Sequence, residues 1–233
     1  RWSVYALQPP EDASPQTLEN FEVLARLYLQ EIRQRLPLNQ LVLGGFCAGA
    51  YIALEMAHQL EQEGGPAPLL AVFNTDGAWR TLRTVRDNLW FHTLQLQARP
   101  GVLGKMGYVT ERAGYRVDRV KNRLLGSLAS WMVRVGWTPP ARLQAHRLRA
   151  ALHKANLRYK PRPVRAPVLL LQGQQQDRLD PLRFWSQVAS EVEVRYVPGS
   201  GDDVFRPPAV IELARELSLA LEEGMLQRRL APR

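Results

Sequence analysis

An apolar run that leads directly into a helical pattern, through a cysteine between two glycines, constrains the fold of this 233-residue chain most strongly. Residues 41–46 read LVLGGF, which is typical of a buried strand, and residues 48–62 have helical periodicity. Between them, residues 45–49 read GFCAG and match the elbow pattern G-x-[nucleophile]-x-G. Such a turn strains the backbone of its central residue, and glycines on both sides are expected to make room. We therefore predict an α/β fold with Cys47 raised above the end of a strand.

Short apolar runs separated by helical patterns continue this arrangement along the chain. The runs suit buried parallel strands, because such strands are covered on both faces. Alternation of strand and helix predicts an open, doubly wound and mostly parallel sheet. The predicted strands are residues 4–7, 41–46, 69–73, 168–171 and 192–197, and the predicted helices are residues 15–36, 48–62 and 207–226.

The alternation stops in a long basic segment. From residue 79 to about residue 159 the pattern predicts several helices, broken at Gly101, Gly104, Gly126 and Pro139-Pro140. A helical insertion after a strand end is where a lid covers a site. We expect a single domain of residues 1–233, with a core of residues 1–78 and 160–233 and a helical lid of about residues 79–159.

The basic charge of the chain is concentrated in this insertion. The formal net charge is +9, and residues 112–165 hold fourteen Arg or Lys side chains against the single acid Asp118. One interpretation is a solvated helical face together with a general excess of arginine. The other is attraction for an anionic partner, such as a phosphate or an acidic protein. No nucleic-acid-binding motif accompanies the charge, so we do not expect nucleic acid as a partner.

The cysteine, histidine and hydropathy patterns argue against a disulfide-rich, metal-binding, membrane-spanning or secreted protein. One cysteine makes no disulfide framework, and the four histidines lack metal-ligand spacing, so we expect neither a metal nor a cofactor bound by the chain itself. No run approaches 18 apolar residues, and the start RWSVYALQPP does not resemble a signal peptide. We expect no membrane association and a cytoplasmic location.

The elbow would equip Cys47 for nucleophilic catalysis. A thiol at a helix N-terminus is stabilised as the thiolate, and the backbone N–H of Ala48 would point at a developing oxyanion. An acid should lie at the end of a following strand, and Asp76 does so in LLAVFNTDGAW. Asp76 is alternatively a helix cap. Asp177 and Asp180, after the next strand, are rival acids.

Several segments together resemble the terminal thioesterase domains of nonribosomal peptide and polyketide synthetases. They cover nearly the whole chain, more weakly in the insertion, and read VYALQPP, LVLGGFCAGAYIALEMAHQLEQEGG, LLAVFNTDGAW, YKPRP, VLLLQG and VEVRYVPG. Those domains are α/β-hydrolases with a helical lid. The resemblance implies Cys47 as nucleophile, Asp76 as acid and Ala48 as one oxyanion donor. It also implies an acyl substrate delivered on the phosphopantetheine of an acyl or peptidyl carrier domain.

The sequence departs from this family at three points. Cys47 stands where the family usually has the elbow serine, which marks an unusual subtype with a cysteine nucleophile. The family's histidine follows the last strand in a pattern like Val-Pro-Gly-x-His, whereas residues 197–201 here read VPGSG, so Gly201 replaces it. The family's earlier strand and the glycine-bearing loop that supplies a second oxyanion donor have no counterpart before residue 1, so we expect that part of the fold to be absent.

The general base must then come from elsewhere. His92 follows Asp76 by sixteen residues in the first predicted helix of the insertion, from which it can fold back over the site. His146 is the second candidate, on a later helix. Each histidine is alternatively a packing or surface residue. Asp202 and Asp203 lie beside the vacated histidine position.

These features lead to a functional prediction. We expect a thioesterase or cyclase that accepts a peptidyl or polyketide chain on Cys47 and releases it by intramolecular cyclisation, as a β-lactam, a β-lactone or a tetramate. The alternatives are a hydrolytic editing thioesterase, and a catalytically inactive hydrolase fold that docks carrier domains.

Overall fold

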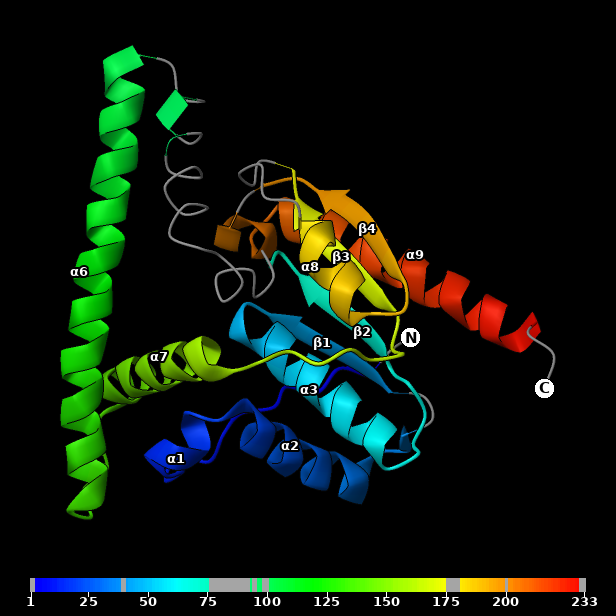
Figure 1. The fold of residues 1–233 in the computed structure, drawn as a ribbon, viewed down its shortest axis with the longest axis horizontal. Coiled ribbons are helices and arrows are strands. Elements are labelled where there is room, and N and C mark those ends of the chain that lie inside the picture. Colours follow the sequence, from blue (N-terminus) through cyan, green and yellow to red (C-terminus); the bar gives the residue numbers. More distant parts are fainter. Residues whose placement is uncertain are drawn as a thin grey trace. The chain divides into compact units, whose positions relative to one another are not determined.

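The structure is a computed structural model, and it describes residues 3–38, 41–75, 93, 96–97, 101–174, 181–199 and 201–230 (Figure 1). The chain forms two compact units. Unit 1 comprises residues 1–24 and 80–160, and unit 2 comprises residues 25–79 and 161–233. The sequence prediction assigns residues 1–24 to the core, whereas by contacts they group with the helical insertion.

Unit 2 is built on a parallel sheet. The strands are β1 (Val42–Phe46), β2 (Leu69–Phe73), β3 (Val168–Gly173) and β4 (Val192–Val197). Within the described residues, their order across the sheet is β1-β2-β3-β4. Every neighbouring pair is parallel, so the carboxyl ends of all four strands lie along one edge.

Helices cover both faces of this sheet (Figure 1). On one side α3 (Ala48–Gln62) and α8 (Pro181–Val188) meet through Tyr51, whose ring lies 6.1 Å from that of Phe184. On the other side α9 (Ala209–Leu230) packs through Leu213 and Ala220 against the β3 residues Leu169 and Leu171. Because side chains alternate along a strand, Leu170 of β3 faces α3 and α8, and it is fully buried. This is the predicted doubly wound arrangement.

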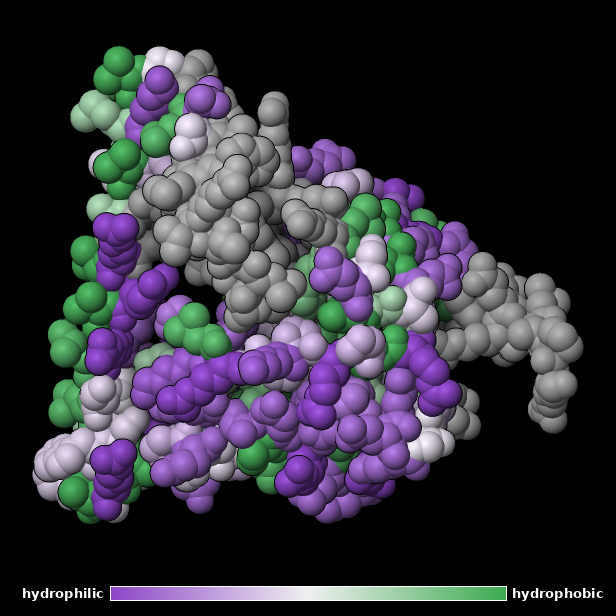
Figure 2. Space-filling view, viewed as in Figure 1, coloured by the Kyte–Doolittle hydropathy of each residue, from purple (hydrophilic) through white to green (hydrophobic). Residues whose placement is uncertain are grey.

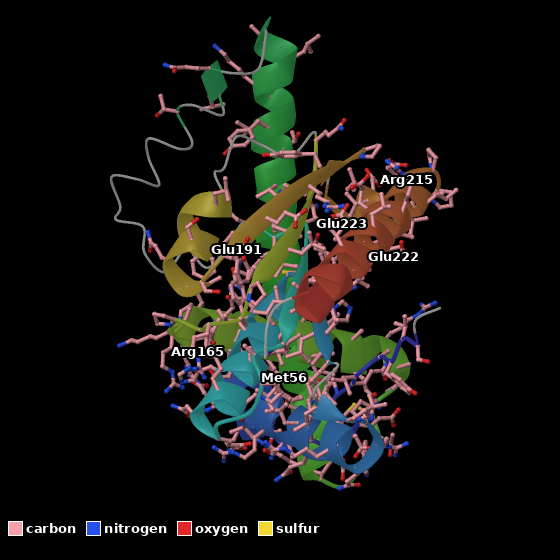
Figure 3. All side chains as sticks on the ribbon, turned by 90° about the vertical axis from the view of Figure 1, so that its right-hand side faces the viewer. Met56, Arg165, Glu191, Arg215, Glu222 and Glu223 are labelled. Carbon is pink, nitrogen blue, oxygen red and sulfur yellow. The ribbon has the colours of Figure 1, made fainter. Side chains whose placement is uncertain are left out.

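Charged side chains attach the helices of unit 2 to its strands. Glu61 near the end of α3 accepts from the backbone N–H groups of Arg165 and Ala166, which lead into β3. On β4, Arg195 binds Glu223 of α9, which is labelled in Figure 3. Met56, also labelled there, belongs to the buried side of α3. The helices that cover the sheet are therefore held by ion pairs as well as by apolar contacts.

Unit 1 contains α1 (Pro15–Leu18), α6 (Gly101–Arg134) and α7 (Ala141–Arg158). Arg147 of α7 is 5% exposed and donates to the backbone oxygens of Glu11, at 3.1 Å, and Ala13. Burial lowers the pKa of Arg147 below its ordinary value, against the opposing effect of the nearby Asp12 carboxylate. Arg147 thus fastens the N-terminal segment to α7.

Two sequence predictions about helices are wrong in detail. The predicted helix of residues 15–36 is divided into α1 and α2 (Phe21–Arg35), because the side chain of Asn20 accepts from the N–H of Val23 and starts a new helix. The predicted breaks at Gly104 and Gly126 do not occur, and α6 runs through both. A Cβ at Gly126 would lie 3.0 Å from the Cβ of Ala150, so this glycine permits close packing of α7 rather than ending a helix.

The predicted strand of residues 4–7 is also wrong. These residues have no regular secondary structure, and Val4 is 91% exposed. An apolar run of four residues is too short to distinguish a strand from an extended segment by periodicity alone. Over the part of the chain that the structure describes, no helix is long and apolar enough to span a membrane.

Candidate active site

Cys47 occupies the turn between β1 and α3, at the carboxyl edge of the sheet. Its backbone has φ 52° and ψ −119°, a conformation that residues with a side chain rarely adopt. The side chain is exposed. This is the elbow that the sequence predicts: the strain turns the chain sharply at Cys47 and presents its sulfur above the sheet.

Gly45 makes this elbow possible. A Cβ at Gly45 would lie 2.3 Å from the carbonyl carbon and oxygen of Gly49, which is far inside van der Waals contact. At Gly49, by contrast, a Cβ would meet none of the described atoms within 4 Å. The prediction that both glycines make room is therefore right for Gly45 and wrong for Gly49.

Ala48 is the first residue of α3, directly after the cysteine. The first N–H groups of a helix lack partners within it and carry the positive end of the helix dipole. The first turn of α3 is closed by a hydrogen bond of 3.2 Å from the N–H of Ala50 to the carbonyl of Cys47. The role of the Ala48 N–H as an oxyanion donor remains a prediction.

Three phenylalanines form a cluster beside the elbow. Phe205 ends η2 (Gly201–Phe205), the short 3₁₀-helix that follows β4. Its ring lies 5.0 Å from that of Phe46, the residue before Cys47, and 6.1 Å from that of Phe73 at the end of β2. Phe46 is 37% and Phe205 39% exposed, so apolar surface remains open next to the cysteine.

Asn74, the residue after β2, connects the ends of two strands with the start of η2. Its Oδ1 accepts from the N–H of Gly173 at 2.9 Å, and its Nδ2 donates to the carbonyl of Gly201 at 2.7 Å. Its own N–H extends the ladder by donating to Leu171 at 2.8 Å. Asn74 is 5% exposed and has a φ of 42°. Asn74 therefore ties the ends of β2 and β3 to the start of η2.

The sequence analysis missed Asn74. A signal for it was present, because a polar residue that directly follows the buried strand LLAVF stands where site residues gather in parallel sheets. The predicted acid, Asp76, lies two residues later. Phe205 was missed as well, and a single aromatic in a predicted loop carries no signal of its own.

The vacated histidine position lies in this same region. Gly201 is the first residue of η2 and has a φ of 51°. A Cβ there would meet none of the described atoms within 4 Å. Asp203, further along η2, is exposed and pairs with Arg206 at 3.3 Å. Asp202 belongs to η2 as well, but its side chain lies outside the described part.

Of the two candidate bases, only His146 belongs to the described residues. It lies on α7 in unit 1, half-buried, with its Nδ1 2.5 Å from Oδ1 of Asn122 on α6. The contact accounts for one ring nitrogen within unit 1. Cys47 and Ala48 belong to unit 2. Their assignment together with His146 to one site remains a prediction.

The remaining predicted site residues lie outside the described residues. They are Asp76, His92, Asp177 and Asp180. Among the residues that are described, no three His, Cys, Asp or Glu side chains form a group that could hold a metal ion.

Comparison with known proteins bears on this arrangement. Residues 1–88 match the family model described as Thioesterase domain. No curated protein matches the chain.

Solved structures extend the similarity over most of the chain. The NocB thioesterase domain from the nocardicin cluster, in covalent complex with a fluorophosphonate nocardicin G analog, has a TM-score of 0.55 at 19% identity, over 87% of this chain and 75% of that one. RedJ, a thioesterase from the prodiginine pathway of Streptomyces coelicolor, has a TM-score of 0.51 at 20% identity, over 85% and 70%. The four-domain nonribosomal peptide synthetase holo-AB3403 has a TM-score of 0.55 at 18% identity over 86% of this chain, which spans 16% of that protein.

These findings confirm the predicted fold class and the predicted resemblance. Over its described residues this chain has a parallel sheet with helices on both faces, a sharp strand-to-helix turn after β1 and helices inserted between β2 and β3. Over its first 88 residues the chain matches the thioesterase domain family model, and it has the α/β-hydrolase fold of the NocB and RedJ thioesterases.

Proposed function

We propose that this chain is an acyl-transfer enzyme that takes a peptidyl or polyketide chain from a carrier domain onto Cys47 and releases it as a ring. The observation that carries the proposal is the exposed cysteine at the strained elbow, with φ 52°, at the first turn of α3. A packing cysteine needs neither the strain nor the exposure. Backbone strain of this kind persists where the surrounding structure enforces it, and it is concentrated at functional sites.

Cysteine suits a step that keeps the acyl group activated. Transfer from the carrier thioester breaks one thioester and forms another on Sγ of Cys47, and the carrier thiol leaves with the proton. A thiolate needs less assistance from a general base than a serine hydroxyl does. The exposed rings of Phe46 and Phe205 beside Cys47 provide apolar surface for the acyl chain.

The residue at the vacated histidine position favours cyclisation over hydrolysis. Gly201 has no side chain that could activate water. An internal nucleophile of the acyl chain depends less on such activation, because well-oriented intramolecular attack reaches effective molarities of roughly 10⁵ M or more. We therefore propose release as a small ring, of the β-lactam, β-lactone or tetramate type, with hydrolysis as the competing outcome.

The proposed partner is an acidic carrier domain with its phosphopantetheine arm. The outer surface of α6 carries exposed basic side chains, among them Arg116, Arg119 and Arg123, and hydrophilic residues alternate with apolar ones along this helix in Figure 2. Positive potential of this kind attracts an anionic partner and raises its rate of association.

Intact-protein mass spectrometry with an acyl-pantetheine thioester tests the nucleophile. We expect a mass increase equal to the acyl group, lost in Cys47→Ala and retained as a more stable oxoester in Cys47→Ser. No adduct on the wild-type protein would reject the enzyme and favour an inactive fold that docks carrier domains. Analysis of the released acyl group then separates the modes of release, since a free acid identifies an editing hydrolase and a product smaller by one water identifies a cyclase.

A further inference from the structure

The side chain of Asn74 makes two hydrogen bonds of opposite polarity. The N–H of Gly173 can only donate and the carbonyl of Gly201 can only accept, so the partners fix which end of the amide is oxygen and which is nitrogen. Both bonds have normal lengths, 2.9 and 2.7 Å, and the side chain is 5% exposed. A buried polar group of this kind is costly unless both of its ends are satisfied.

No other common side chain of this size serves both partners in this place. A carboxylate accepts from Gly173 but has no proton for Gly201, and leucine offers neither function. The backbone of Asn74 is also in the left-handed region, at φ 42°, which asparagine and aspartate tolerate better than most residues. Residue type, conformation and contacts therefore agree.

Around this contact, the end of β3 lies very close to the chain that leads from β4 into η2. A Cβ at Gly173 would lie 2.6 Å from the carbonyl oxygen of Gly199, so the end of β3 presses against the chain that leads from β4 into η2. The N–H of Gln174 donates to the carbonyl of Val197 at 2.9 Å in the same region. Asn74 thus fixes the first residue of η2 against a closely packed edge.

The far end of η2 lies beside the nucleophile. Phe205, its last residue, contacts Phe46, which directly precedes Cys47. With one end bound to Asn74 and the other packed on Phe46, η2 forms a wall next to the thiol. The hydrogen bond from Asn74 to Gly201 therefore acts on the apolar surface that an acyl chain on Cys47 would contact.

We propose that Asn74 is a positioning residue for acyl transfer to Cys47, acting through η2 and Phe205. The proposal rests on the function proposed above. It assigns to this amide the task of holding the loop at the vacated histidine position, so that the site keeps a fixed wall without a catalytic side chain there. The side-chain hydrogen bonds of Asn74 go to Gly173 and Gly201, so its effect is through the placement of η2.

Asn74→Asp is the informative variant, because it keeps the size and shape of the side chain and replaces the N–H donor with a carboxylate oxygen. The new carboxylate keeps the bond from Gly173, tolerates the same φ, and faces the carbonyl oxygen of Gly201 without a proton to share. We expect the second-order rate of Cys47 acylation by an acyl-pantetheine thioester to fall about tenfold at neutral pH, the effect of losing one hydrogen bond. We also expect faster amide hydrogen exchange in residues 201–206.

Protonation of the new carboxyl restores a donor, which gives a pH signature. The ratio of variant to wild-type acylation rates should rise toward one as the pH falls through the pKa of the introduced carboxyl group. Burial beside a carbonyl oxygen favours the neutral acid, so this transition should lie above the ordinary aspartate value of about 4. The charged pair Asp203 and Arg206 on η2 is common to both proteins and cancels in the ratio.

Asn20→Asp is a matched control. The side chain of Asn20 accepts from the N–H of Val23, a role that a carboxylate fills equally well. We expect no loss of acylation and no change of the rate ratio with pH in this variant.

The outcomes separate the two hypotheses. If wild-type Cys47 is not acylated, the proposed function fails and the positioning role fails with it. If the wild-type protein is acylated and Asn74→Asp matches it at every pH, or if hydrogen exchange in η2 is unchanged, the enzyme stands and the inference about Asn74 is overturned.

Discussion

At the scale of single residues, the two glycines of the elbow differ although the sequence pattern treats them alike. Gly45 is enclosed by the backbone of Gly49, and the clash at 2.3 Å involves main-chain atoms that cannot swing aside. Gly49 faces open space in the described part of the chain. The pattern G-x-[nucleophile]-x-G therefore contains one strict and one permissive position here.

We predict a severe effect for Gly45→Ala and almost none for Gly49→Ala. The first should lower the free energy of unfolding by about 3 kcal/mol, at the upper end of overpacking costs, and abolish acylation of Cys47. The second should leave both near the wild-type values. Urea denaturation together with the mass-spectrometric acylation assay measures the pair, and equal effects of the two variants would contradict this account.

A histidine introduced at Gly201 should change the fate of the acyl-enzyme. The Cβ meets none of the described atoms within 4 Å, and histidine is among the residues that adopt the φ of 51° found there. An imidazole beside the elbow would activate water, so we expect Gly201→His to hydrolyse the Cys47 acyl-enzyme faster. Gly201→Asn, which tolerates the same φ but supplies no base, is the control. An unchanged decay of the adduct in Gly201→His would argue against a base position at residue 201.

Tyr28 on α2 should affect stability at alkaline pH. Burial raises its pKa to about 12, compared with 10 for an unhindered phenol. A group whose folded pKa is raised stabilises the fold fully below the unfolded value, and this contribution is lost as the pH rises through the folded value. We expect the melting temperature of the wild-type protein to fall more between pH 10 and 12 than that of Tyr28→Phe. Parallel curves for the two proteins would refute the assignment.

At the scale of elements, the periodic helices and strands could be predicted from the sequence, whereas helix breaks set by single side-chain contacts or by packing could not. The helix of residues 48–62 was predicted to the residue, because it buries a continuous apolar face. The strands at 69–73 and 192–197 were predicted to the residue as well, although the second is a partly exposed strand at the end of the described sheet. The division between α1 and α2 depends on one side-chain hydrogen bond from Asn20, which competes with the helix locally. The continuity of α6 through Gly126 depends on packing with α7, which no local pattern encodes.

The same contrast holds within the candidate site. The position of Cys47 follows from a short motif and was predictable. The contact of Asn74 with Gly201 joins residues 127 positions apart, and no local sequence pattern predicts it. A short sequence motif predicts the elbow and its cysteine, whereas the walls around it arise from long-range packing.

The basic surface of α6 should influence loading from carriers and not from small thioesters. We predict that the triple change of Arg116, Arg119 and Arg123 to Glu slows acylation of Cys47 by an acylated carrier domain about tenfold or more at low ionic strength, where electrostatic steering is strongest. The effect should shrink as salt is added. Acylation by an acyl-pantetheine thioester in solution should be unchanged, and an equal loss with both donors would exclude docking as the cause.

At the scale of the whole molecule, the chain divides into a sheet-based unit with the elbow and a helical unit with α6 and α7. Arg195 and Glu61 bind partners within unit 2, and Arg147 binds the backbone at residues 11 and 13 within unit 1. Compact units with their own contacts commonly open with separate free energies.

Arg147→Ala should therefore open unit 1 without opening unit 2. Its removal leaves two backbone carbonyls without a charged donor, which should lower the local stability by about 2–3 kcal/mol. We expect faster amide hydrogen exchange in α1 and α7, and unchanged exchange in β2 and β3. Arg149→Ala, at an exposed position on the same helix, should leave both regions unchanged. Equally faster exchange in β2 and β3 after the loss of Arg147 would show instead that the two units unfold as one, and that the insertion contributes to the stability of the sheet that bears Cys47.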